Sequence, residues 1–189
     1  MAATLMPAQV QAKPTACDYA AAHPDDPDKV LPGFERSEID LAAAETTCRE
    51  VLEEMPDHAR TNYLLGRVLF YQQRQNEALP FLEAAEDAGY RQSIFVLGYI
   101  DKEGFIESAD ACRGLDRLRR GVSLEHPWSG YHVVDGTLSG KFDDCDSPPE
   151  RAELQRAMAL VSENVTVAAS EGRVEALMRK LADAEGSEG

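Results

Sequence analysis

The chain has 189 residues, of which 34 are acidic and 19 basic, so its formal net charge is −15 at pH 7. This acidity argues against nucleic acid and anionic membrane surfaces as partners, because both are bound through basic surfaces. No segment approaches the roughly 18 consecutive apolar residues of a membrane-spanning helix, so we expect no membrane insertion. Apolar residues make up 43% of the chain and charged residues 28%, which is typical of one globular domain or of an array of small repeats.

The N-terminal segment, residues 1–13, is mostly small and apolar. It contains Val10-Gln11-Ala12, a small-residue pattern of the kind that precedes a signal-peptide cleavage site. The segment lacks a basic start and the length of a complete signal peptide. We expect the remnant of an export signal or a disordered leader, with an ordinary frayed N-terminus as the alternative.

The four cysteines form an even set without a C-x-x-C motif, which argues against zinc knuckles and thioredoxin-like redox sites. They are Cys17, Cys48, Cys112 and Cys145. Three disulfide connectivities are possible, and proximity in sequence favours Cys17–Cys48 and Cys112–Cys145. The alternative is four reduced cysteines in a cytosolic protein. Disulfides together with the cleavage-like segment favour an oxidising compartment.

Several sequence markers recur with a period of about 32 to 33 residues, the signature of a repeat protein. Leu65-Gly66 recurs as Leu97-Gly98, and Ala78 recurs as Ala111. Within each unit the apolar residues follow the periodicity of helices. The predicted helices cover residues 59–71, 77–88, 91–101, 108–120 and 127–138, then a long helix from a capping box at 147–150 to about 169, and a last helix that ends near 182.

Three residues define expected helix ends. Asn76 is the predicted N-cap of the helix over 77–88. Gly89 is expected to end that helix in a left-handed conformation. Gly172 is expected to separate the long C-terminal helix from the last one.

These residues resemble the tetratricopeptide repeat and its Sel1-like relative, a helix pair with leucine-glycine in the first helix and two alanines in the second. Residues 84–104 are especially similar to the junction between two Sel1-like units, and residues 17–33 to the segment that precedes such repeats in exported bacterial proteins. The resemblance covers about residues 17–138. Two departures are Asn62, where the tetratricopeptide family prefers tryptophan, and the third unit, which lacks leucine-glycine.

The resemblance implies an all-α fold, a right-handed α-solenoid of stacked helix hairpins with a long C-terminal capping helix. A single helix pair cannot bury its apolar face, so neighbouring pairs must complete the core. We expect Gly66, Ala78, Ala85 and Gly98 at the close contacts between helices. The predicted repeat domain covers residues 14–184, with units over about 34–58, 59–90, 91–122 and 123–147, cap helices over 148–184, and a disordered tail over 185–189.

The family register also implies a partner-binding surface on the concave face of the first helices. Aromatic and arginine side chains are common anchors at protein interfaces. For Phe70, Phe95 and Tyr131, the alternative is a place in the core. The expected partner-binding residues are Arg60, Tyr63, Arg67, Phe70, Phe95, Tyr99, Lys102 and Tyr131.

The sequence offers little support for catalysis. His126 and His132 lie six residues apart, a poor spacing for two metal ligands on one helix. Ser129 lacks the G-x-S-x-G motif of a nucleophile elbow. We therefore expect no enzyme, no metal and no cofactor. A small metal-dependent enzyme that uses His126 and His132 is the less favoured alternative.

The sequence as a whole predicts a non-catalytic protein- or peptide-binding scaffold or adaptor. It would act in the bacterial periplasm or envelope, or be secreted. The alternative from another class is a structural subunit of a homo-oligomer.

Overall fold

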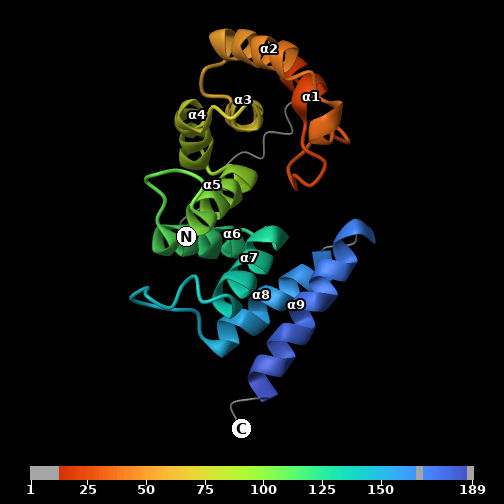
Figure 1. The fold of residues 1–189 in the computed structure, drawn as a ribbon. Helices are drawn as coiled ribbons and strands as arrows, with labels where there is room; N and C mark the ends of the chain where they lie inside the picture. The colour runs from red at the N-terminus through yellow and green to blue at the C-terminus, as the bar shows by residue number, and fades with distance from the viewer. Residues whose placement is uncertain (1–12, 165–167, 187–189) are drawn as a thin grey trace, which may run out of the picture.

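The computed structural model describes residues 13–164 and 168–186. In these residues all regular secondary structure is helical (Figure 1), which confirms the predicted all-α class. None of the described helices is both long and apolar enough to cross a bilayer. The α-helices are α1 (Ala16–Ala21), α2 (Leu41–Glu54), α3 (Ala59–Tyr71), α4 (Gln75–Asp87), α5 (Arg91–Glu103), α6 (Ala111–Ser123), α7 (Pro127–Leu138), α8 (Arg151–Asn164) and α9 (Ala168–Gly186), with a 3-10 turn at Arg36–Glu38.

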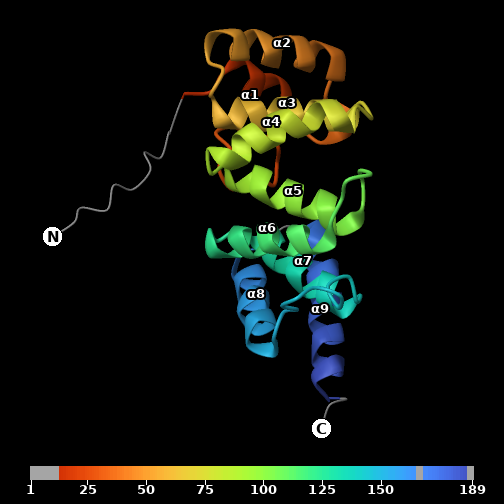
Figure 2. The same ribbon diagram turned by 90° about the vertical axis from the view of Figure 1, so that its left-hand side faces the viewer.

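Consecutive helices pack as pairs, α3 with α4, α5 with α6 and α7 with α8. The pairs are stacked along one direction, with α2 at one end and α8 and α9 at the other (Figure 2). The first helices of the pairs begin at Ala59, Arg91 and Pro127, which are 32 and 36 residues apart. The second step is longer than the predicted period because a longer loop joins α5 to α6 than joins α3 to α4.

Glycines allow the two helices of a pair to approach closely. A Cβ atom on Gly66 of α3 would lie 2.7 Å from the Leu82 side chain of α4, and one on Gly98 of α5 would lie 3.1 Å from the Gly114 carbonyl of α6. Ala78 and Ala85 of α4 are fully buried. These four small residues therefore lie at tight helix contacts, as predicted.

Gly130 has the same function in the third pair. A Cβ atom on this residue of α7 would lie 2.7 Å from the Ala157 carbonyl of α8. Gly130 is the fourth residue of its helix, whereas Gly66 and Gly98 are each the eighth, so the close contact occurs one turn earlier in the third pair. The second helix of this third pair is α8, which was expected to be part of the cap.

Both favoured disulfides are present. Cys17–Cys48 joins α1 to α2, with an S–S distance of 1.96 Å, and Cys112–Cys145 joins α6 to the loop after α7, with an S–S distance of 2.04 Å. Each closes a loop of about 30 residues and stabilises the fold by about 3 kcal/mol, mainly by restricting the unfolded chain.

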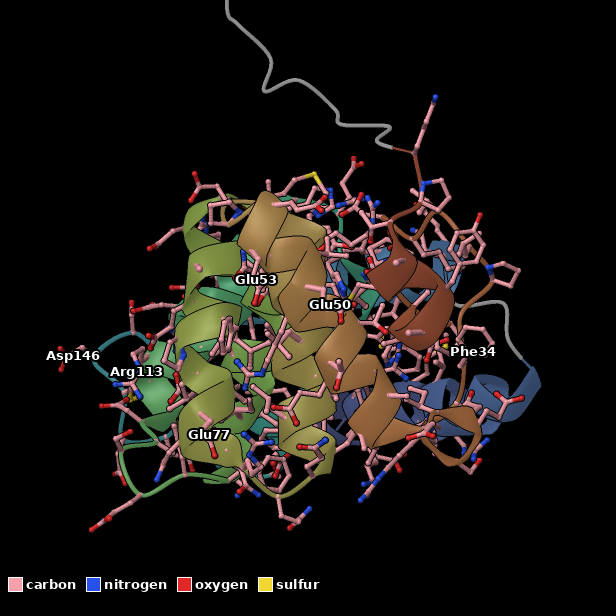
Figure 3. The ribbon with its side chains drawn as sticks, turned by 90° about the horizontal axis from the view of Figure 1, so that it is seen from above. Phe34, Glu50, Glu53, Glu77, Arg113 and Asp146 are labelled. Atoms are coloured by element: carbon pink, nitrogen blue, oxygen red, sulfur yellow. A yellow bond between two sulfur atoms is a disulfide. The ribbon has the colours of Figure 1, made fainter. Side chains whose placement is uncertain are left out.

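The outer end of the stack is polar. Figure 3, viewed from above, shows Glu50 and Glu53 on the outward side of α2, and both residues are exposed. The opposite side of α2 carries Ala44 and Cys48, which are buried against α1 and α3. A charged outer face closes the apolar core at this end, as in the terminal unit of a repeat protein.

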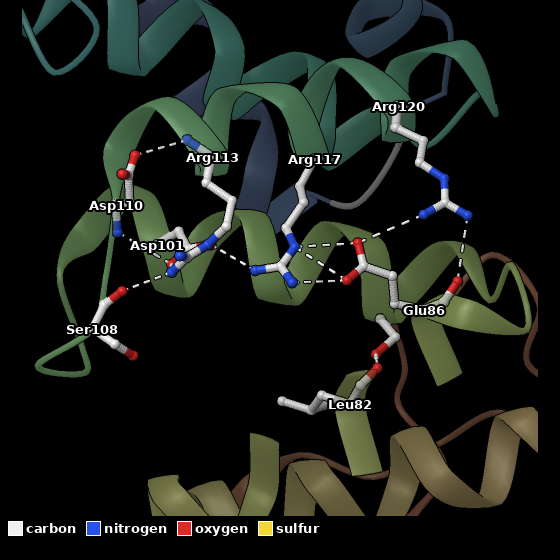
Figure 4. Close-up of polar contacts among 9 residues, drawn as sticks. Leu82, Glu86, Asp101, Ser108, Asp110, Arg113, Arg117 and Arg120 are labelled. Carbon is white, nitrogen blue, oxygen red and sulfur yellow. Dashed lines mark hydrogen bonds and ion pairs between the residues drawn. The ribbon is translucent and has the colours of Figure 1, made fainter. Parts of the chain in front are cut away.

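Ion pairs connect the second helix pair to the first (Figure 4). Arg117 of α6 lies between Glu86 of α4 and Asp101 of α5, with N–O distances of 2.8 and 2.6 Å. Arg113 bonds both carboxylate oxygens of Asp101. Burial alone would raise the pKa of Asp101, but the hydrogen bonds from Arg113 and Arg117 hold it below its usual range. The carboxylate therefore stays charged inside this contact.

Three local predictions are wrong. The N-cap of α4 is Arg74 rather than Asn76; its guanidinium bonds Glu77 in the first turn. Gly172 lies inside α9 instead of separating two helices, because a single glycine at an exposed position lowers helix stability by only about 1 kcal/mol. The long helix starts at Arg151, not in the capping box; it is described as far as Asn164, and residues 165–167 lie outside the described residues.

The C-terminal tail is also shorter than expected, because α9 continues to Gly186. The predicted export remnant in residues 1–12 and the end of the tail, residues 187–189, lie outside the described residues.

Candidate functional site

A pocket of about 280 Å³ lies on the inner side of the stack. One wall is the leader loop, residues 22–34, which joins α1 to the turn before α2. The other walls come from α3, α5, α7 and α9, which lie around this side in Figure 1. The lining residues are His23, Asp25, Tyr63, Arg67, Phe70, Tyr71, Leu82, Gln92, Phe95, Val96, Tyr99, Ile100, Trp128, His132 and Arg173.

Aromatic rings form a continuous strip across the pocket. Phe95 of α5 stacks on Tyr99 one turn later, with ring centroids 6.2 Å apart, and on His132 of α7 at 5.6 Å. Tyr99 packs edge-on against Phe105 at 5.3 Å, and Phe105 reaches Phe70 of α3 at 6.1 Å. Rings from three successive first helices thus meet on one surface, because the helices repeat in register along the stack.

Five of the eight predicted partner-binding residues line this pocket. Phe70, Phe95 and Tyr99 are half-buried, so part of each ring is accessible, whereas Tyr63 and Arg67 are buried in the pocket floor. The family register therefore placed these five residues on a common surface.

The other three residues lie outside the pocket lining. Arg60 is buried and forms an ion pair with Asp18 of α1 at 2.6 Å. Burial would raise the pKa of Asp18, but the hydrogen bonds from Arg60 lower it, so the pair is charged. Tyr131 packs edge-on against Trp128, with ring centroids 5.7 Å apart. Arg60 thus joins α1 to α3, and Tyr131 packs against Trp128, which lines the pocket.

Lys102 is also engaged within the chain. Its Nζ atom lies 2.6 Å from Asp135 Oδ2 of α7 and 2.9 Å from Glu103 Oε1. Only 2% of the residue is exposed. Lys102 was expected to bind a partner, but its ammonium group is buried and already paired with carboxylates of the same chain.

Arg67 binds the leader loop. Its Nη1 donates to the carbonyls of Ala21 and Ala22 at 2.9 Å, and its Nη2 donates to the Phe34 carbonyl at 2.7 Å. Its Nε donates to the Tyr71 hydroxyl at 3.1 Å. All of these acceptors are neutral, so the guanidinium holds both ends of the leader loop without an ion pair among the described residues.

Two further contacts fix the leader loop beside the pocket. Asp26 is buried with 1% exposed, and it accepts a hydrogen bond from the Tyr90 hydroxyl at 2.5 Å. Asp28 forms a bidentate ion pair with Arg91, at 2.6 and 2.9 Å. Sequence analysis did not identify this loop as a pocket wall, because the partners of Asp26 and Asp28 are more than 60 residues away in the chain.

The histidines around the pocket are neutral at pH 7. Burial, together with nearby cations, lowers the pKa of His23, His126 and His132 to about 3. His126 forms a hydrogen bond with Gln92, Nε2 to Oε1, at 2.8 Å, and it stacks on Phe95 with ring centroids 4.7 Å apart. These rings therefore contribute apolar and hydrogen-bonding surface but no charge.

One side-chain cluster has the composition of a metal site. Ligand atoms of Glu103, His132 and Asp135 lie within 4.8 Å of one another. The ammonium group of Lys102 bonds both carboxylates, however, and it is too deeply buried to move into solvent. A built-in cation thus already bridges the two carboxylates. His126 takes no part in the cluster, so the residues do not fit the metal-dependent enzyme considered from the sequence.

Comparison with known proteins identified no relative. No protein-family model matches the chain, and no significant match was found among curated proteins or solved structures. The relationship to the tetratricopeptide and Sel1-like repeats therefore stays a prediction.

Proposed function

We propose that the chain is a non-catalytic repeat scaffold or adaptor that binds a segment of another protein in the pocket on its inner side. The observation that carries this proposal is the strip of half-buried rings from Phe70 to Trp128, contributed by three successive first helices. Accessible aromatic side chains next to a pocket are typical anchors of protein interfaces. Ion pairs join the pocket walls, Asp28 to Arg91 and Lys102 to Asp135, which favours a preformed surface over a flexible one.

We also propose that the chain is a right-handed solenoid related to the tetratricopeptide and Sel1-like repeats. Stacked helix pairs with glycine contacts at Gly66 and Gly98 support this assignment. For its compartment we propose the bacterial periplasm or envelope, or secretion from the cell. The two disulfides support an oxidising environment.

A capture experiment in the native host tests the binding proposal. The double variant Phe70→Ala and Tyr99→Ala removes two accessible rings from the pocket. The matched control is Tyr19→Ala, because Tyr19 is an aromatic residue with 64% exposed and it does not line the pocket. Helix content and melting temperature of each variant show that the fold is retained.

We expect the double variant to lose a partner that the wild type and the Tyr19→Ala control both retain after crosslinking and purification. Equal recovery of that partner by all three proteins would rule out the pocket as the binding surface.

A further inference from the structure

The buried cations of this chain fall into two classes. Arg60 and Lys102 lie against carboxylates of the same chain, Asp18 and Asp135, each at 2.6 Å. Arg67 is buried to a similar degree, with 5% exposed, yet its bonds reach only carbonyl oxygens and a hydroxyl. A buried charge without a counter-charge is costly, so the environment of Arg67 favours the arrival of an anion.

The Arg67 guanidinium also has an unused donor. An arginine side chain has five N–H groups, and the four hydrogen bonds within the described residues use one on Nε, two on Nη1 and one on Nη2. The second N–H of Nη2 therefore has no acceptor among the described residues, and Arg67 lines the pocket.

The opposite wall of the pocket provides a second cation. Arg173 of α9 is exposed and lies over the Trp128 ring, with its Cζ 5.3 Å from the ring centroid. The lining contains one carboxylate, Asp25, and its two histidines are neutral. Two guanidinium groups thus outweigh one carboxylate inside a chain whose net charge is −15, and the pocket is locally positive.

The size of the pocket limits what enters it. A volume of about 280 Å³ is at the lower end of the range for small-molecule sites, and it suits one large side chain. A second, more polar depression of about 590 Å³ shares Asp25 and Trp128 with the pocket. Its lining contains four carboxylates, from Asp25, Asp26, Glu125 and Glu163, against the two cations Lys29 and Arg91. It therefore gives room to uncharged residues on either side of the inserted side chain, and it disfavours carboxylates of that chain.

Building on the proposed function, we infer that the pocket binds an internal, acidic segment of a partner protein, with an aromatic side chain inserted between Phe70, Phe95 and Tyr99. A neighbouring carboxylate of that segment pairs with Arg67 and Arg173. The acidic body of the protein repels such a segment elsewhere, so the local positive charge makes the pocket selective.

Trp128 allows a direct measurement, because it is the single tryptophan of the chain and it lines both depressions. The probes are three capped pentapeptides, acetyl-Gly-Glu-Phe-Glu-Gly-amide and its counterparts with glutamine or lysine in place of both glutamates. The caps remove terminal charges, so a carboxylate comes only from side chains. Titration of the oxidised, full-length protein is followed by tryptophan fluorescence.

We expect saturable binding of the glutamate peptide with a dissociation constant about ten-fold or more below that of the glutamine peptide. The lysine peptide should bind more weakly still, and added salt should reduce the difference between the glutamate and glutamine peptides. The variant Arg173→Gln should bring the dissociation constants of the glutamate and glutamine peptides closer together. The control Arg179→Gln, also on α9, should leave their difference unchanged, because the Arg179 side chain is 70% exposed and does not line the pocket.

Equal affinity for the glutamate and glutamine peptides, or no saturable binding of any peptide, would overturn the inference about charge. The proposed function is judged separately by loss of the native partner from the Phe70→Ala and Tyr99→Ala double variant. A partner lost from that variant alongside equal peptide affinities would therefore contradict only the acidic character of the ligand.

Discussion

The hydroxyl of Tyr90, at the N-cap of α5, donates a hydrogen bond to the buried carboxyl of Asp26 in the leader loop at 2.5 Å. This bond joins parts of the chain that are 64 residues apart. Burial raises the pKa of Asp26 to about 6, although the hydrogen bonds from Tyr90 and from the Asp28 backbone N–H counteract the rise. The wall of the pocket therefore contains a carboxyl that titrates near neutral pH.

The variant Asp26→Asn should become more stable relative to the wild type as the pH rises from 4 to 7. The folded wild type holds the Asp26 proton more tightly than the unfolded chain does, which stabilises the folded state. This stabilisation is complete below the ordinary pKa of 3.8 and is lost as the pH rises through the folded-state pKa of about 6. The asparagine does not titrate. We expect the difference in unfolding free energy to change by about 2 kcal/mol between pH 4 and pH 7.

Urea unfolding of both proteins at pH 4 and at pH 7 checks this prediction. The control is Asp25→Asn, which removes a neighbouring carboxyl that is exposed rather than buried. A constant difference between Asp26→Asn and the wild type would contradict the assignment.

Arg67→Gln should release the leader loop, because the carbonyls of Ala21, Ala22 and Phe34 lose their shared donor. Trypsin should then cleave after the exposed Lys29 several times faster than in the wild type. The control Arg36→Gln removes an exposed arginine that bonds the Tyr71 carbonyl and covers the Tyr71 ring, and it should leave the rate nearly unchanged. Equal cleavage rates in the two variants would show that Arg67 does not hold this loop.

Two glycine-to-alanine variants should change stability in opposite directions. A Cβ atom on Gly114 would lie 2.8 Å from the Lys102 backbone nitrogen, so α5 and α6 must separate and stability should fall by about 1 to 3 kcal/mol. At Gly172 a Cβ atom meets nothing within 4 Å, so Gly172→Ala should raise stability by up to about 1 kcal/mol. Melting temperatures with the same sign of shift would contradict the helix packing described above.

The two disulfides should differ in their rates of reduction. Cys17 and Cys48 are fully buried, whereas Cys112 is half-buried and Cys145 is 9% exposed. Under a native-state pulse of reductant followed by alkylation, mass mapping should find labelled Cys112 and Cys145 first. Earlier labelling of Cys17 and Cys48 would show that α1 opens more readily than the structure implies.

The helix boundaries were predictable where short-range sequence patterns determine them. The boundaries of α3 and α7 agree with the predictions over 59–71 and 127–138, because apolar periodicity and a proline at the first position of α7 fix them. The break at Gly172 was wrong, because glycine weakens an exposed helix without ending it. The lengthened second repeat was missed, because loop length carries little energetic signal.

The pocket was predictable only in part, because some of its contacts join residues that are distant in the sequence. Tyr63, Arg67, Phe70, Phe95 and Tyr99 share a pocket because one repeat register places them there. Arg60 and its partner Asp18 are 42 residues apart in the sequence. Lys102 and its partner Asp135 are 33 residues apart. Arg173 reaches the pocket because α9 packs along α7. Such pairings arise from the tertiary fold and leave no local pattern.

Site-specific photo-crosslinking tests the central claim most directly. A photoreactive phenylalanine analogue replaces Tyr99, in the pocket, or Tyr19, on the outer surface of α1, and each protein is irradiated in its native host. We expect a discrete crosslinked partner from position 99 and none from position 19. The same partner at both positions, or a partner at position 19 alone, would contradict binding in the pocket.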